Sequence, residues 1–75
     1  MKKEYKDKYL IQVRDDIIIP LNRIDTIVKT NKVPDSDQLY NSDMYIIYFI
    51  KNSHYTLISL TEKTFNKYLK KYINI

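Results

Sequence analysis

Residues 44–60, MYIIYFIKNSHYTLISL, decide the fold class of this chain. Apolar side chains fill both sets of alternating positions over residues 44–51, which is typical of a central strand covered on both faces. Asn52 and Ser53 supply a turn, and residues 55–60 alternate again. The stretch therefore predicts a β-hairpin whose first strand lies inside a sheet.

A second hairpin is predicted upstream of the first. Residues 9–14, YLIQVR, place Tyr9, Ile11 and Val13 on one face and polar side chains mostly on the other. Two aspartates then supply a turn, and residues 17–19 form a short strand that ends before a proline, which cannot donate to a ladder.

Residues 21–30, LNRIDTIVKT, predict a short helical turn followed by a third strand. Their apolar spacing lets Leu21 and Ile24 face the core together with either Ile27 or Val28. This strand would join the two hairpins into one sheet.

Residues 31–43, NKVPDSDQLYNSD, are dense in Pro, Ser, Asn and Asp and predict a long loop. Asp35, Asp37 and Asp43 offer oxygen atoms of the kind that bind Ca²⁺ or Mg²⁺. A calcium loop of the EF-hand type also needs a glycine at its bend and a terminal bidentate acid, and both are missing here. We therefore expect a solvated loop without a metal or cofactor.

The last segment changes from strand to helix period. Thr61 is a plausible N-cap, Glu62 lies in the first turn, and the pattern predicts an amphipathic helix over residues 62–74. Its apolar face comprises Phe65, Tyr68, Leu69, Tyr72 and Ile73. The predicted fold is therefore α+β, a mainly antiparallel sheet of four to five strands with this helix on it, in one domain over residues 1–75 with a charged segment at residues 1–8.

The phrase IIIPLNRIDTIVK at residues 17–29, followed by a loop, the hairpin of residues 44–60 and a terminal helix, resembles the later half of small bacterial pleckstrin-homology-like domains. The resemblance covers residues 17–73. It implies a pleckstrin-homology-like fold and carries over no binding residue.

The chain has no glycine, no cysteine and one histidine, and these absences exclude several function classes. Glycine-rich nucleotide loops, disulfides and the usual zinc sites cannot be built from the remaining residues. His54 has no local serine and acid in a catalytic arrangement, so we expect it to be an exposed turn residue. The sequence thus favours a protein that is not an enzyme.

The composition is rich in Ile, Lys, Tyr and Asn, which AT-rich coding produces, and the net charge is +4. We take this as a sign of a low-GC bacterium, its phage or a mobile element. The seven-residue apolar run at 44–50 is far shorter than the roughly 20 residues that span a membrane, and the N-terminus lacks a signal pattern. A cytoplasmic protein without membrane contact is predicted.

Tyrosines and an uncovered sheet face favour protein binding as the function. A single helix covers one face of a sheet, so the other face would expose a large apolar patch. A second copy of the chain would cover the patch as a homodimer, or the chain would act as an inhibitor, encoded by a phage or a mobile element, that covers a site on a host defence protein. The candidate contact residues are Tyr5, Tyr9, Tyr40, Tyr45, Ile47 and Phe49.

The alternative function is nucleic-acid binding through the polar face of the C-terminal helix. Lysine side chains at helical spacing would follow a phosphate backbone if they formed one continuous stripe. These lysines are Lys63, Lys67, Lys70 and Lys71.

Overall fold

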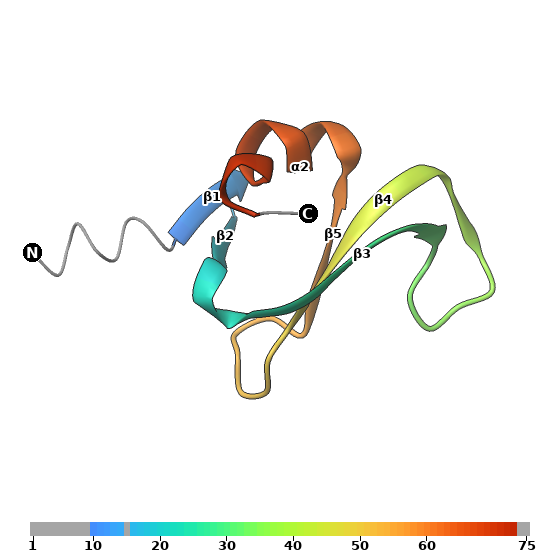
Figure 1. Ribbon diagram of the computed structural model, residues 1–75. Helices are drawn as coiled ribbons and strands as arrows, with labels where there is room; N and C mark the ends of the chain where they lie inside the picture. Colours follow the sequence, from blue (N-terminus) through green and yellow to red (C-terminus); the bar gives the residue numbers. More distant parts are fainter. Residues whose placement is uncertain (1–9, 15, 74–75) are drawn as a thin grey trace, which may run out of the picture.

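The part of the chain that the structure, a computed structural model, describes is residues 10–14 and 16–73. It forms two antiparallel sheets followed by one α-helix (Figure 1). The predicted α+β class is therefore confirmed. The elements are β1 (Leu10–Arg14), β2 (Ile17–Pro20), the 3₁₀ turn η1 (Leu21–Arg23), β3 (Ile24–Lys32), β4 (Leu39–Phe49), β5 (Leu57–Thr61), α2 (Glu62–Tyr68) and the 3₁₀ turn η2 (Lys70–Tyr72).

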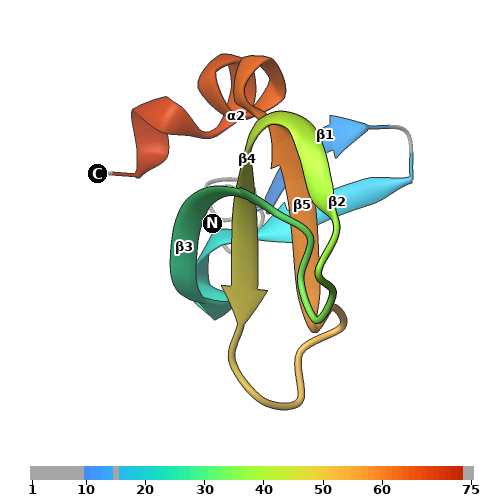
Figure 2. The same cartoon turned by 90° about the vertical axis from the view of Figure 1, so that its right-hand side faces the viewer.

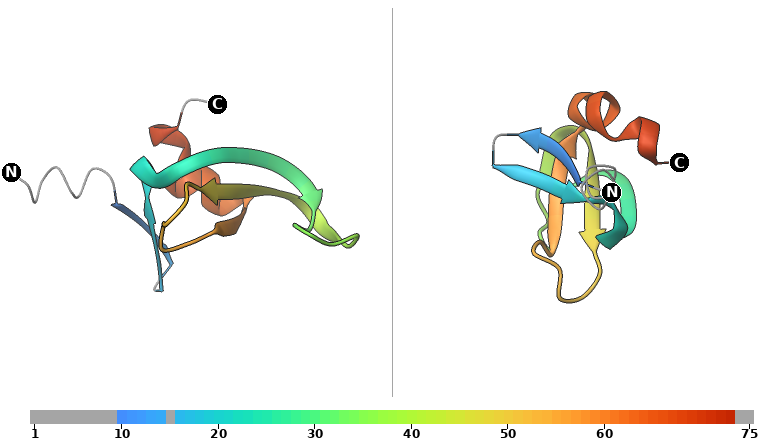
Figure 3. Two further views of the ribbon diagram at one scale, coloured as in Figure 1. Left: turned by 90° about the horizontal axis from the view of Figure 1, so that it is seen from below. Right: turned by 90° about the vertical axis from the view of Figure 1, so that its left-hand side faces the viewer.

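The five strands divide into a two-stranded sheet, β1-β2, and a three-stranded sheet in the order β3-β4-β5, so the prediction of a single sheet is wrong. The chain leaves β2 at Pro20, whose nitrogen has no hydrogen to donate, and turns through η1 before β3 begins. The Ile50 N–H donates to the Arg23 carbonyl at 2.9 Å and fixes this turn against the end of β4. As a result, the β1-β2 hairpin runs across the strands of the other sheet instead of extending it (Figure 3).

The predicted loop over residues 31–43 is also wrong, because β3 continues to Lys32 and β4 begins at Leu39. Only residues 33–38 connect the two strands, and the Val33 N–H closes this turn on the Gln38 carbonyl at 3.0 Å. Asn, Ser and Asp at 41–43 are poor strand formers, but here all three are exposed at the far end of the ribbon. Their side chains are open to solvent, while the pairing of the ribbon keeps the backbone extended.

The end of the ribbon formed by β3 and β4 curls toward β5, because the pairing register of these two strands shifts strongly there. From the pair Thr30–Met44 to the pair Lys32–Leu39, β3 advances by two residues and β4 by five, so β4 carries the extra length of a bulge. In Figure 2 the first half of β4 arches over and passes in front of β5. The Tyr40 hydroxyl meets the Ser59 hydroxyl of β5 at 3.1 Å, which fastens the curl.

The C-terminal helix begins at the predicted N-cap. The Thr61 hydroxyl accepts a hydrogen bond from the Thr64 N–H at 3.2 Å, and Glu62 lies in the first turn. The α-helix ends at Tyr68 instead of continuing to residue 74, and the chain tightens into η2, where the Ile73 N–H bonds the Lys70 carbonyl. No glycine is present to end the helix in the left-handed conformation, and the 3₁₀ turn takes its place.

The main core lies between the three-stranded sheet on one side and the hairpin and α2 on the other. Val13 and Ile19 of the hairpin meet Phe65 and Leu69 of the helical segment over the β4-β5 face. Leu21, Ile24 and Ile27 pack at its margin, whereas Val28 points outward. The buried side chains of this cluster are Val13, Ile19, Ile47, Phe49, Ile58, Leu60, Phe65 and Leu69.

Two turns place a side chain other than glycine in the left-handed region, at Asp35 with φ 56° and at Asn52 with φ 66°. Aspartate and asparagine tolerate this region better than other residues that carry a Cβ atom. Asn52 belongs to the connection 50–56 between β4 and β5, which is longer than the predicted two-residue turn. The Phe49 N–H donates to the Thr56 carbonyl at 3.1 Å and closes this connection.

We expect Asn52→Val to lower the free energy of unfolding by about 1–2 kcal/mol, because a β-branched side chain is strained at positive φ. Asn52→Gly is the matched control and should change stability by less than about 0.5 kcal/mol. Urea unfolding of the three proteins measures both changes. Equal stability of the valine and glycine variants would contradict the left-handed assignment.

Candidate functional site

The candidate contact residues from the sequence do not form one surface. Tyr5 and Tyr9 lie outside the described residues. Tyr40 is half-buried and bonded to Ser59. Tyr45 is also half-buried, and its ring stacks on Phe65 with centroids 3.8 Å apart and planes 10° apart.

Ile47 and Phe49 belong to the core, with 0% and 8% of their surfaces exposed, so neither offers a surface to a partner. The prediction failed because the hairpin β1-β2 folds across the sheet and covers, with α2, the face that carries both side chains. On the opposite face of β4, Ile46 is 1% exposed and is paired with Ser59 of β5, whose hydroxyl meets the Tyr40 hydroxyl from the first part of β4. The uncovered patch that suggested a homodimer is therefore absent from the described part of the chain.

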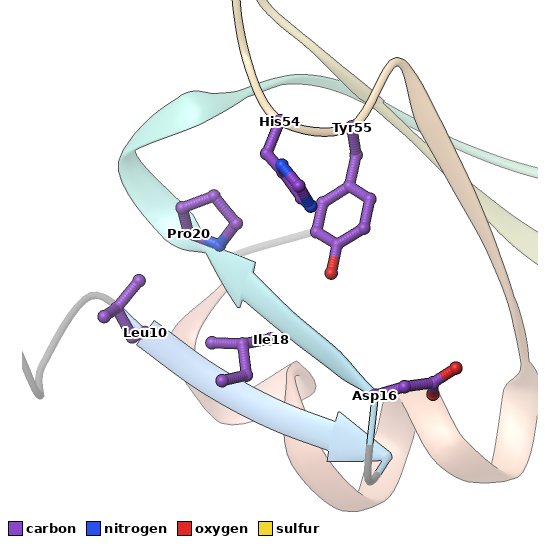
Figure 4. A pocket seen from close by; sticks show the side chains of 6 residues that line it. All are labelled: Leu10, Asp16, Ile18, Pro20, His54 and Tyr55. Atoms are coloured by element: carbon purple, nitrogen blue, oxygen red, sulfur yellow. The ribbon is translucent and has the colours of Figure 1, made fainter.

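A different apolar surface lies on the outer face of the β1-β2 hairpin. Leu10 and Ile18 are 40% and 45% exposed there. Together with the connection 50–56 they border a pocket of about 380 Å³, called here the hairpin pocket (Figure 4). Its lining residues are Leu10, Asp16, Ile18, Pro20, His54 and Tyr55.

The wall of the hairpin pocket opposite the strands is built from two aromatic rings. Tyr55 contacts Phe49 of the core at 5.8 Å between centroids, and His54 meets Tyr55 edge-on at 4.7 Å. Figure 4 shows His54 and Tyr55 beside Pro20, with Asp16 at the far end of the strand. The anchoring of Tyr55 to the core holds this wall in place, which is a form of preorganisation.

Sequence reasoning missed the role of Leu10 and Ile18, although a signal was present. In a strand, successive side chains point to opposite faces, so three consecutive isoleucines at 17–19 must place at least one outward. The same alternation puts Leu10 opposite Ile11 and Val13. What the sequence did not show is that the connection 50–56 lies close enough to make this face a concave site.

The four lysines of the alternative function do not all lie in one place. Lys63 and Lys67 are exposed on α2, on the side away from Phe65 and Leu69 by helical spacing. Lys67 and Lys71 lie over the rings of their neighbours Tyr68 and Tyr72, each 5.2 Å from the ring centroid. Lys70, which begins η2, instead lines a second pocket beside β3.

This second pocket, called here the lysine pocket, measures about 390 Å³. The Lys29 ammonium on its rim donates a hydrogen bond to Glu62 Oε2 at 3.2 Å. That bond, together with the carboxylate charge, raises the pKa of Lys29 above its ordinary value. The lining residues of the lysine pocket are Ile27, Lys29, Tyr45, Phe65 and Lys70.

The raised pKa makes the coupling between Lys29 and Glu62 depend on pH. The favourable coupling should be fully present at about pH 7–9, below the unfolded pKa of lysine, and be lost as the pH rises through the higher pKa of the folded ammonium. A double-mutant cycle of Lys29→Met and Glu62→Gln, measured by urea unfolding over a series of increasing pH values, isolates this term from the interaction of Glu62 with the helix dipole. A coupling that does not fall as the pH rises above the unfolded pKa of lysine would contradict the charge-based account.

No three histidine, aspartate or glutamate side chains gather closely enough within residues 10–14 and 16–73 to hold a metal ion. Within the same residues, no helix has both the length and the apolar character to cross a bilayer.

Comparisons of the chain with protein-family models, with curated proteins and with solved structures found no match. The resemblance to pleckstrin-homology-like domains therefore stays a prediction.

Proposed function

We propose that the protein is a non-enzymatic protein-interaction module and that the hairpin pocket is its contact site. The supporting observation is the pair of half-exposed aliphatic side chains, Leu10 and Ile18, beside a pocket whose aromatic wall is fixed to the core. Protein interfaces gain most of their affinity where a side chain of one partner fills a desolvated pocket of the other. A protein of this size acts simply by covering a site on its partner, as an inhibitor of a host protein does.

The pocket itself also favours binding over catalysis. Its polar groups are the Asp16 carboxylate, the His54 imidazole and the Tyr55 hydroxyl, and its other three lining residues are aliphatic. Asp16 and His54 come from opposite sides of the pocket in Figure 4, with Tyr55 between them. Among the described residues no hydrogen bond joins these three side chains into a catalytic arrangement, so what the site offers is shape and apolar surface.

Substitution of Ile18 tests this function. We expect Ile18→Lys to weaken binding to the partner roughly tenfold or more, because an ammonium replaces an apolar anchor. Val28→Lys is the matched control, since Val28 is 39% exposed on the other sheet and does not line the hairpin pocket. Affinity capture from a low-GC bacterial lysate, followed by titration of the captured protein against the variants, gives both affinities.

Equal affinity of the Ile18→Lys and Val28→Lys variants would reject the hairpin pocket as the contact site. Loss of binding in both variants would show a non-specific dependence on surface apolarity and reject it as well. Both residues are half-exposed on strands, so circular dichroism should report folded protein in each case.

The exposed lysines of α2 support a second candidate, nucleic-acid binding. Lys63 and Lys67 project from the same side of the helix, and Lys71 follows in η2. If this candidate is correct, affinity for a single-stranded oligonucleotide falls steeply with salt and falls again when Lys63 and Lys67 are both replaced by glutamine. A flat salt dependence would exclude it.

A further inference from the structure

We infer that the lysine pocket binds a small ligand that joins a flat ring to a phosphate group. This site is independent of the hairpin pocket, because the two share no lining residue. The chemical class fits because the pocket combines an apolar aromatic lining with two ammonium groups from different elements.

The lining of the lysine pocket is fixed in place by the core. The ring of Tyr45, half-buried, stacks on Phe65, which is completely buried in the main cluster. Ile27 of β3 packs against the same cluster. A planar ligand therefore meets a surface of aromatic and aliphatic groups that needs no rearrangement, which lowers the entropic cost of binding.

The two ammonium groups of the lysine pocket differ in how far nearby carboxylates neutralise them. Lys29 is paired with Glu62 and is attracted more weakly by the charge of Asp43. Its ammonium lies 5.8 Å from the centroid of the Tyr45 ring. The Lys70 ammonium has no hydrogen-bond or ion-pair partner within residues 10–14 and 16–73. The pocket therefore keeps an uncompensated positive charge at its η2 side.

A phosphate group on the ligand would complete this arrangement. Its oxygens would accept hydrogen bonds from the Lys70 ammonium and share the Lys29 ammonium with Glu62, while the ring would lie against Tyr45 and Ile27. Lysine binds phosphate as a compact point charge with three donors, so it adapts to the position of the group. Free nucleotides and the ends of nucleic-acid strands both carry this combination of ring and phosphate.

The test is a titration followed by ¹H–¹⁵N NMR with four probes, which are adenosine monophosphate, adenosine, inorganic phosphate and a short single-stranded oligonucleotide. We expect adenosine monophosphate to shift amide signals of β3 and η2 and to bind at least fivefold more tightly than adenosine or phosphate alone. Lys70→Gln should weaken that binding at least fivefold. Lys51→Gln, at an exposed lysine of the connection 50–56 outside the pocket, is the matched control and should leave it unchanged.

Three results would overturn the inference. The first is the absence of shifts in β3 and η2 at millimolar adenosine monophosphate. The second is an equal effect of Lys51→Gln and Lys70→Gln, which would indicate diffuse charge attraction. The third is phosphate binding as tightly as the nucleotide, which would remove the role of the ring. Oligonucleotide binding through its terminal phosphate at Lys70 would support the inference and identify the strand end as the source of the ligand.

Discussion

Phe65→Ala should lower the free energy of unfolding by about 3–5 kcal/mol and the melting temperature by roughly 15 °C or more. Phe65 is fully buried, and its ring stacks on Tyr45. It lies in the same core cluster as residues of the β1-β2 hairpin and of the three-stranded sheet. Truncation leaves a cavity where α2, the β1-β2 hairpin and the three-stranded sheet meet. A 75-residue domain has a total stability of only about 4–11 kcal/mol, so the variant should be close to unfolding at room temperature.

Calorimetry or thermal circular dichroism measures the effect of Phe65→Ala, and Asn66→Ala is its control because Asn66 is exposed on the same helix. The control should change stability by less than about 0.5 kcal/mol. A fall in melting temperature under about 5 °C for Phe65→Ala would mean that α2 does not pack on the sheet as described.

Ile46→Ala should cost about 2–5 kcal/mol, which tests the curl of β4 over the outer face of the sheet. Ile46 is buried although it lies outside the main core cluster, on the opposite face of β4. If that face were open to solvent, the same substitution would cost less than about 1 kcal/mol. Val28→Ala, at the position paired with Ile46 on β3, is the control and should cost far less than Ile46→Ala.

A second variant tests the contact that fastens the curl. Tyr40→Phe removes the hydrogen bond to Ser59 and should lower stability by about 0.5–1.5 kcal/mol. Its effect should shrink in an Ser59→Ala background, since the partner is then already missing. Independent, additive effects of the two substitutions in urea unfolding would show that these hydroxyls do not meet in solution.

Local chemistry allowed much of the fold to be predicted. Alternation located both hairpins, Pro20 marked the end of β2, and Thr61 with Glu62 marked the start of the helix, because each of these signals acts over a few residues. The extension of β3 and β4 into residues 31–43 was missed, since Asn, Ser and Asp adopt strand there only by pairing across the ribbon. The division into two sheets depends on where the hairpin packs, which is a tertiary contact.

The candidate site was less predictable for the same reason. Ile47 and Phe49 looked available because both faces of β4 are apolar, and apolar faces are buried or exposed according to what lies over them. The pockets that contain Ile18 and Lys70 are completed by segments more than 30 residues away along the chain. These segments are the connection 50–56 for Ile18 and the strand β3 for Lys70. No spacing rule along the chain connects such positions.

Because the β1-β2 hairpin is separate from the other sheet, the edges of its strands affect how readily the protein aggregates. In the described part of the chain neither strand bonds to a third one, so both leave edges at which strands of other molecules could add. The strands are only five and four residues long, a bulge interrupts β1 between Gln12 and Arg14, and Pro20 ends β2. Short length, a bulge and a terminal proline are the features by which natural sheets resist edge-to-edge polymerisation, and the hairpin can therefore stay apart from the sheet without seeding fibres.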